Sequence, residues 1–333
     1  MAKVTYKNKI FQCNNSTSLL DTILASGTFM ANSCKNGFCQ ECMAKAVKGT
    51  PPRASQEGLK QHYVNQSCFL PCRCFPTEDM EIEDATSDNV SKEDLGISPF
   101  NTYSVMVLEK KWLTHDVMRL CLMKPEVFCY KAGQFLNIAQ TNTKETRSYS
   151  LASLPCENFF ELHIKRIPNG IVSNWICDDM ALGSDIDISG PAGSCYYQQG
   201  KPHQPLILVG IGTGLAPIYG IVRDAVESNH LGDIFLFHAT SEASQLYYQD
   251  ELTALVEETT NVQYIPCVLH GQSPENGQQG LIQDVVANHV GALSDMTAYL
   301  CGDGPTIVAI TETLVQLGVA PQEIYSDTFY VPG

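Results

Sequence analysis

The sequence has no long apolar run: none of its stretches approaches the roughly 20 residues that a membrane-spanning helix needs. Its first segment, MAKVTYKNKIFQCNN, has no apolar stretch after the lysines, so a cleaved export signal is not expected. Basic residues are also few, with 21 Lys and Arg against 36 Asp and Glu and a net charge of −15. This balance disfavours non-specific nucleic-acid binding, which needs cations facing phosphates. We therefore expect a cytoplasmic protein that binds neither a membrane nor nucleic acid.

Charged residues make up only 17% of the chain and hydrophobic residues 44%, which excludes a disordered chain and predicts a globular one. At about 100–200 residues per domain, 333 residues predict two or three domains. Tryptophan is scarce, with two residues, whereas cysteine is abundant, with 14. Because no export signal is expected, so many cysteines indicate free thiols or metal ligands rather than disulfides.

Seven of these cysteines lie in the first 74 residues: Cys13, Cys34, Cys39, Cys42, Cys68, Cys72 and Cys74. The first ligand group follows the pattern C-x4-C-x2-C from Cys34 to Cys42, and 29 residues separate Cys42 from Cys72. This is the ligand spacing of a plant-type [2Fe–2S] cluster. Zinc, the alternative, prefers paired CxxC-like ligands, and one pair alone has that spacing here. We predict Cys34, Cys39, Cys42 and Cys72 as the iron ligands, with Cys74 left open as an alternative to Cys72.

The pattern of elements predicts a multidomain chain. Residues 1–86 predict a compact α+β domain, and their cysteine spacing and LPCRCFPTEDMEI ending resemble a plant-type ferredoxin of the β-grasp fold. Residues 87–100 continue an acidic, polar stretch and are predicted to be a linker. In residues 101–199, short alternating runs bounded by turn residues predict an antiparallel β-barrel. In residues 200–333, apolar strands alternate with helices, which predicts an α/β domain with a parallel sheet covered on both faces.

One strand of the predicted barrel ends in Arg147-Ser148-Tyr149-Ser150, whose side chains suit a flavin. Arg147 can hold a phosphate, Tyr149 can pack against a flat ring, and Ser150 can hydrogen-bond a ring nitrogen or carbonyl. Further along, the segment from Gly170 to Ser173 can present backbone N–H groups and a hydroxyl to a pyrophosphate near a helix start. Taken alone, Tyr149 would more often be a core residue.

In this order, these residues resemble the RxYS and GxxS motifs of the ferredoxin–NADP reductase superfamily. The resemblance implies that the barrel binds FAD and that seven residues line it: Arg147, Tyr149, Ser150, His163, Lys165, Gly170 and Ser173. Members of the superfamily often shield the flavin with an aromatic residue near the C-terminus. By that resemblance we choose Phe329, for which a core role is the alternative.

Two glycine motifs mark the predicted nucleotide domain. After the first strand, Gly212-Thr213-Gly214 opens a helix, and its glycines let the backbone approach a pyrophosphate at the helix N-terminus. The turn departs from GxGxxG because Leu215 stands at the last glycine position. Its continuation GTGLAP resembles the pyridine-nucleotide motif of the same superfamily. The run Cys301-Gly302-Asp303-Gly304-Pro305 resembles the CGxGP motif, whose cysteine lies beside the nicotinamide; an isolated Cys301 would be a core residue.

The loop after the second strand, residues 238–242, bears on the choice of nucleotide. A ribose 2′-phosphate calls for a basic residue at this place, and the loop has neither Arg nor Lys. Glu242 can instead accept a hydrogen bond from a ribose 2′-hydroxyl and repel a phosphate. We therefore predict NADH rather than NADPH, with a solvated Glu242 as the alternative.

The three predicted domains, in the order iron–sulfur, flavin, nicotinamide, cover nearly the whole chain. Together they resemble the reductase components of multicomponent oxygenases. This implies hydride transfer from NADH to FAD, then single electrons through the cluster to an oxygenase partner. Ser150 and Cys301 are the residues we place nearest the hydride step. One alternative is a reductase for a small acceptor, such as a ferric complex, a flavin or a sugar-nucleotide intermediate. Another is a carrier or redox-sensing module whose nucleotide domain only binds. A monomer fits a chain that must dock a mobile donor domain.

Overall fold

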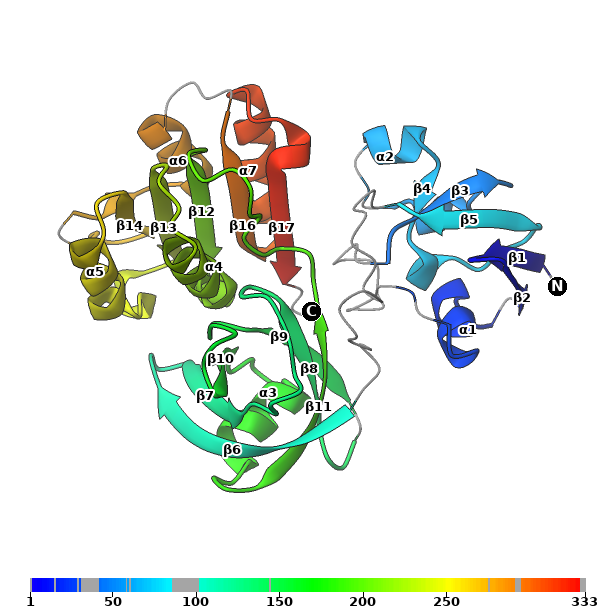
Figure 1. Cartoon of the computed structure of the whole chain (residues 1–333), viewed down its shortest axis with the longest axis horizontal. Coiled ribbons are helices and arrows are strands. Elements are labelled where there is room, and N and C mark those ends of the chain that lie inside the picture. Colours follow the sequence, from blue (N-terminus) through cyan, green and yellow to red (C-terminus); the bar gives the residue numbers. More distant parts are fainter. Residues whose placement is uncertain are drawn as a thin grey trace. The chain divides into compact units, whose positions relative to one another are not determined.

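The computed structural model describes residues 2–14, 16–28, 30, 42–57, 59, 61–85, 102–143, 145–274, 276–290 and 295–329. The chain divides into two compact units, residues 1–96 and 97–333 (Figure 1). The predicted linker, residues 87–100, lies outside the described residues. In the described part of the chain, no helix combines the length and the apolar character needed to cross a bilayer.

The first unit holds a five-stranded mixed sheet in the order β2-β1-β5-β3-β4. Its strands are β1 Ala2–Tyr6, β2 Lys9–Cys13, β3 Ala44–Lys48, β4 Cys68–Phe69 and β5 Met80–Asp84, and its helices are α1 Leu19–Ala25 and α2 Gln61–Asn65. Helix α1 begins where the Ser18 hydroxyl accepts a hydrogen bond from the Asp21 amide at 3.1 Å. Leu19, Leu20 and Ile23 of this helix are fully buried against the sheet core. This is the predicted α+β domain.

The second unit begins with a six-stranded antiparallel sheet in the order β10-β7-β6-β11-β8-β9. Its strands are β6 Thr102–Trp112, β7 Val117–Met123, β8 Phe135–Ala139, β9 Thr146–Ser150, β10 Phe159–Lys165 and β11 Asp185–Ala192. A bridge between Leu151 and Leu162 joins the end of β9 to β10, so the two outer strands of the sheet meet. Leu120, Leu136 and Phe160 fill the interior and are fully buried. The antiparallel barrel is therefore confirmed.

The rest of the second unit is a six-stranded parallel sheet in the order β15-β14-β13-β12-β16-β17. Its strands are β12 Leu206–Ile211, β13 Ile234–Thr240, β14 Val262–Val268, β15 Gln278–Gln279, β16 Thr297–Asp303 and β17 Ile324–Phe329. Its helices are α4 Leu215–Glu227, α5 Gln249–Glu258, α6 Ile282–Val290 and α7 Gly304–Gln316. Buried residues of α4 and α5 share one core with the sheet, and those of α6 and α7 share another. A parallel sheet covered on both faces is confirmed.

The topology of the parallel sheet identifies where a ligand would bind. From β12 the chain builds outward to β13 and β14 on one side, and then returns to add β16 and β17 on the other. The order of strands therefore reverses between β12 and β16, and such a switch point opens a crevice at the carboxyl ends of the strands. In Figure 1, β17 runs toward the barrel, so in this parallel sheet the carboxyl ends lie on the barrel side.

Candidate active site

The two glycine motifs of the nucleotide domain are in direct backbone contact. Gly212 to Gly214 form one turn of 3-10 helix between β12 and α4. A Cβ atom at Gly214 would overlap the carbonyl oxygen of Cys301 and lie 3.0 Å from the amide nitrogen of Gly302. Gly302 has a φ of +149°, and a Cβ there would lie 2.6 Å from the Cβ of Ile211. Glycine is therefore required at both positions for the crevice between β12 and β16 to form.

Gly212 shows that this crevice suits a pyrophosphate. Its φ of +56° is left-handed, and no atom lies within 4 Å of the place where a Cβ would be. The backbone at the start of the 13-residue helix α4 is thus open to a ligand. Backbone N–H groups and the helix dipole at such a terminus favour an anion. Thr213 lies in the same turn, so the three predicted residues are together at the switch point.

Ser150, Cys301 and Asp327 come together at the junction of the barrel and the sheet. The Ser150 hydroxyl at the end of β9 lies 3.4 Å from Oδ2 of Asp327, although 177 residues separate them. Asp327 on β17 pairs in register with Cys301 on β16, and its backbone amide hydrogen-bonds the Cys301 sulfur. The two residues predicted for the hydride step therefore share one neighbour. The sequence did not reveal Asp327, because its role depends on a contact between separate domains.

Cys301 is fully buried, and its Sγ lies 3.6 Å from Sγ of Cys195. Burial raises the pKa of the Cys301 thiol well above its usual value, and the neighbouring Cys195 thiol adds to the rise. The side chain is therefore a neutral thiol at physiological pH, which suits a packing surface for a nicotinamide ring better than a nucleophile. Cys195 is a second neighbour that sequence reasoning missed.

The flavin motif on β9 places Arg147 and Tyr149 on the barrel beside Ser150. Arg147 is exposed and pairs with Glu145 at 3.3 Å, an exposed contact that a phosphate can replace. Tyr149 packs against the barrel core while remaining partly accessible. Burial raises the pKa of its phenol, so the ring stays neutral. A cation, a flat ring and a hydroxyl thus follow one another along the strand end nearest the crevice.

Two other residues predicted to line the flavin, His163 and Lys165, have protein partners of their own. Both ring nitrogens of His163 are engaged, Nδ1 with the Tyr247 hydroxyl at 3.0 Å and Nε2 with Oε1 of Glu161 at 3.1 Å. This buried side chain thus has one partner in each of the two domains, and its contact with a flavin stays a prediction. Lys165 is exposed, with its Nζ 3.6 Å from Asp116.

The GxxS segment is held by its own serine. Ser173 Oγ accepts a hydrogen bond from the Ile167 amide at 3.2 Å. Gly170 precedes the short helix α3 (Ile171–Asn174), and a Cβ there would lie 2.5 Å from Ser173 Oγ. Gly170 is thus required for this loop, and the contact of either residue with a flavin stays a prediction.

The remaining nucleotide-site residues lie along the carboxyl edge of the sheet. Glu242 follows β13, is exposed, and forms a capping box with Gln245. Asp303 caps helix α7 by accepting from the amide and hydroxyl of Thr306, at 3.1 and 2.8 Å. Phe329 pairs in register with Asp303 and is partly accessible. All three are on the side of the sheet where a nucleotide would lie.

Two of the four predicted iron ligands, Cys34 and Cys39, lie outside the described residues. Cys42 and Cys72 are both buried in the core of the first unit. Cys74 is fully buried as well, so the choice between Cys72 and Cys74 as the fourth ligand stays open. Among the described residues alone, no group of three His, Cys, Asp or Glu could hold a metal.

Comparisons with known proteins agree with this division of the chain. A 2Fe-2S iron-sulfur cluster binding domain matches residues 3–77, an oxidoreductase FAD-binding domain matches residues 104–197, and an oxidoreductase NAD-binding domain matches residues 208–312. The reductase component of a naphthalene 1,2-dioxygenase system from Pseudomonas putida is 28% identical over 326 residues, 98% of this chain and 97% of that protein. The chain belongs to the ferredoxin reductase superfamily.

Two further relatives show the range of the superfamily. A CDP-6-deoxy-L-threo-D-glycero-4-hexulose-3-dehydrase reductase from Yersinia pestis is 26% identical over 323 residues, 96% of this chain and 95% of that protein. The crystal structure of an Amycolatopsis cytochrome P450 reductase has a TM-score of 0.78 and 25% identity, and covers 99% of both chains. The superfamily member described here is an NAD(P)H-dependent iron–sulfur flavoprotein oxidoreductase with sites for a [2Fe–2S] cluster, FAD and NAD(H).

Proposed function

We propose that the protein takes hydride from NADH onto FAD and passes single electrons through the [2Fe–2S] cluster to an oxygenase component. The observation that carries this proposal is the match of the whole three-domain chain, over 98% of its length, to the reductase component of a naphthalene dioxygenase system. The contact of Ser150 with Asp327 supports it, because it brings the flavin motif to the crevice of the nucleotide domain.

The residues of the chain would act mainly by positioning. Bound FAD supplies the conversion of a two-electron hydride donor into single electrons, which a cluster can accept. Gly212 and the start of α4 would hold the nucleotide pyrophosphate. Gly214 keeps the Cys301 backbone at the crevice, where the neutral thiol and the Ser150 hydroxyl would help to position the reacting rings. Hydride transfer needs no general acid or base, so orientation supplies much of the rate.

We propose NADH as the donor because of the loop after β13. Glu242 is exposed at the carboxyl end of this strand, where the adenosine ribose of a nucleotide in the crevice would lie. Its carboxylate can accept from a 2′-hydroxyl and would repel a 2′-phosphate. The capping box with Gln245 fixes the backbone of this loop, so the carboxylate is presented from a defined position.

We also propose the domain boundaries given by the sequence, a cytoplasmic location and a monomer. The boundaries at 86/87, 100/101 and 199/200 fall between β5 and β6 and between β11 and β12. A reducing compartment is supported by the twelve cysteines that are free among the described residues. The separate first unit supports a mobile donor domain, with which a monomer is compatible.

A second function is favoured by one relative. The full-length likeness to the sugar-nucleotide dehydrase reductase of Yersinia pestis supports an acceptor other than an oxygenase. The two functions share every step up to the cluster and differ in the protein or small molecule that takes the electrons.

Reconstitution of the purified holoprotein tests the proposal. NADH is added with an oxygenase component from the same organism, or with a purified sugar-nucleotide dehydrase, and NADH loss and product are measured. We expect oxygenase product in proportion to the NADH consumed. Product with the dehydrase but not with the oxygenase would overturn the proposal, as would electron transfer confined to small ferric complexes or free flavin.

A further inference from the structure

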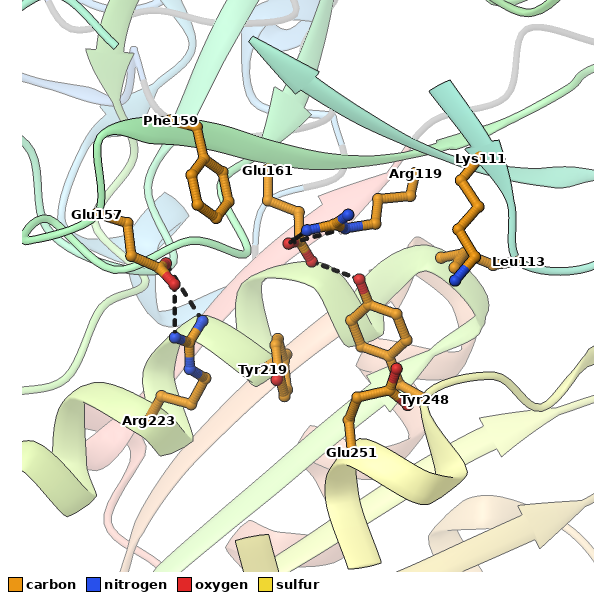
Figure 2. Close-up of a pocket in the computed structure, with 10 residues that line it drawn as sticks. All are labelled: Lys111, Leu113, Arg119, Glu157, Phe159, Glu161, Tyr219, Arg223, Tyr248 and Glu251. Atoms are coloured by element: carbon orange, nitrogen blue, oxygen red, sulfur yellow. Dashed lines mark hydrogen bonds and ion pairs between the residues drawn. The ribbon is translucent and has the colours of Figure 1, made fainter. Parts of the chain in front are cut away.

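A buried carboxylate lies between the barrel and the nucleotide domain, on the strand that pairs with the residues directly after Ser150. Glu161 on β10 is 4% exposed and receives four hydrogen bonds. Arg119 Nε and Nη2 reach Oε2 at 3.0 and 2.8 Å, and the Tyr248 hydroxyl and His163 Nε2 reach Oε1 at 2.6 and 3.1 Å. In Figure 2, dashed lines join the Glu161 carboxylate to Arg119 and to the Tyr248 hydroxyl. A carboxylate with this many donors is fully paired despite its burial.

The network crosses from one domain to the other at a pair of tyrosines. Arg119 and His163 belong to barrel strands β7 and β10, whereas Tyr247 and Tyr248 directly precede α5 of the nucleotide domain. A carboxylate only accepts, so the Tyr248 hydroxyl and His163 Nε2 both donate to Glu161, at 2.6 and 3.1 Å. The Tyr247 hydroxyl is hydrogen-bonded with His163 Nδ1 at 3.0 Å. Both tyrosine contacts join the nucleotide domain to the barrel.

The backbone of Tyr248 is held in an unusual conformation for this contact. Its φ of +59° and ψ of 26° are left-handed, which non-glycine residues rarely adopt. The ring is fixed edge-to-face against His163 at 4.9 Å and against Tyr219 at 5.1 Å. Such a conformation persists only where the surroundings over-determine it, and it clusters at functional sites. The surroundings here are the barrel strand and the carboxylate of Glu161.

Glu161 therefore adds a contact on β10 to those that fix how the two domains meet. Ser150 with Asp327 is another of these contacts, and Arg223 of α4 with Glu157 of the barrel, at 2.8 Å, is a third. The flavin motif is on the barrel and the nucleotide crevice is on the parallel sheet, so their relative orientation decides how nicotinamide approaches flavin. A misplacement of about 1 Å at reacting atoms can slow a reaction by roughly 100-fold.

We propose that Tyr248 and Glu161 are positioning residues for hydride transfer: their hydrogen bond sets the orientation of the nucleotide domain on the barrel. The inference rests on the proposed NADH–FAD chemistry and adds to it a pair of residues outside the set predicted to bind the cofactors. The bond should therefore affect the rate of hydride transfer at saturating NADH and leave the affinity for the nucleotide unchanged, because the glycine turn that would hold the pyrophosphate keeps its own geometry.

The structure offers a matched control in the same pocket. A cavity of about 300 Å³ opens beside the network, and Tyr219 and Tyr248 both line it (Figure 2). Among the residues that the structure describes, the hydroxyl of Tyr219 has no hydrogen-bond partner. Tyr219→Phe thus removes a hydroxyl from the same wall without breaking a contact between the domains. Tyr248→Phe removes the hydroxyl that reaches Glu161 and keeps the ring.

The test compares these two variants as full-length holoproteins. Stopped-flow absorbance gives the rate of flavin reduction at saturating NADH, and equilibrium titration gives the affinity for NAD⁺. We expect Tyr248→Phe to slow reduction about tenfold or more, because the lost hydrogen bond is to a charged group, with NAD⁺ affinity within about twofold of wild type. Amide hydrogen exchange, which needs no turnover, should quicken in β10 and at the start of α5. Tyr219→Phe should match the wild type in all three measurements.

A double-mutant cycle separates positioning from general destabilisation. Glu161→Ala removes the acceptor of the Tyr248 hydroxyl and should slow flavin reduction, and adding Tyr248→Phe should cause little further loss because that contact is already broken. The proposal is overturned if Tyr248→Phe reduces its flavin at the wild-type rate, if its losses are all in NAD⁺ affinity, or if the two losses simply multiply. If NADH does not reduce the flavin of the wild-type holoprotein, the proposed function itself is contradicted.

Discussion

The close approach of Gly214 to Cys301 makes a single methyl group a test of the nucleotide site. A Cβ at Gly214 would lie 2.5 Å from the carbonyl carbon of Cys301, whereas ordinary contacts begin at 3.4 Å. The two backbones would have to separate by about 1 Å, a displacement that can cost roughly 100-fold when it reaches the reacting atoms. Overpacking of this kind also costs about 1–3 kcal/mol of folding stability. We therefore expect Gly214→Ala to fold but to reduce its flavin about 100-fold more slowly with NADH.

Gly304 provides the control for this substitution. It begins α7 two residues after Gly302, and a Cβ there would meet no atom within 4 Å. Gly304→Ala should therefore keep the folding stability of the wild type in urea unfolding. Flavin reduction by Gly214→Ala is measured by anaerobic stopped-flow absorbance, with the cluster bands of the other unit as a check that the chain is intact. A wild-type rate in Gly214→Ala, or an equal loss of stability in both variants, would refute the argument from close packing.

Three further predictions follow from the sites. Cys39→Ser should abolish the cluster absorbance and cytochrome c reduction and spare NADH–ferricyanide activity; an equal collapse of both activities would show that the two steps are not separate. Glu242→Arg should narrow the preference for NADH over NADPH, and an unchanged ratio of kcat/KM values would exclude Glu242 from the site. Hydrogen bonds from His163, Tyr248 and Arg119 outweigh burial and lower the pKa of Glu161 to about 2. Its stabilisation, measured by urea unfolding, should therefore fall between about pH 4.5 and 2 in the wild type and be absent in Glu161→Gln.

The elements of the fold could be predicted because their signals are local. The apolar runs at Leu206–Ile211 and Thr297–Asp303, each followed by glycine and a helix, give a parallel sheet by pattern alone. The glycine motifs were informative for the same reason, since each combines a turn and a helix start within a few residues. Their direct contact follows from the sheet topology, which places β12 beside β16.

The residues that sequence reasoning missed are those whose roles depend on distant partners. Asp327 meets Ser150 across 177 residues, and Tyr248 meets Glu161 across 87. No periodicity or motif marks such pairs, because each partner is an ordinary residue of its own strand or loop. His163 is a further case: the resemblance places it at the flavin, and the sequence did not reveal its hydrogen bonds with Glu161 and Tyr247.

An anaerobic titration of the purified holoprotein with NADH, followed by visible absorbance, tests the central claim most directly. The flavin accepts two electrons and the cluster one, and each NADH supplies two, so complete reduction needs about 1.5 equivalents per chain when the centres are connected. We expect the flavin and cluster bands to bleach together toward that endpoint. An endpoint near one equivalent with the cluster bands unchanged would contradict transfer of electrons from the flavin to the ferredoxin domain.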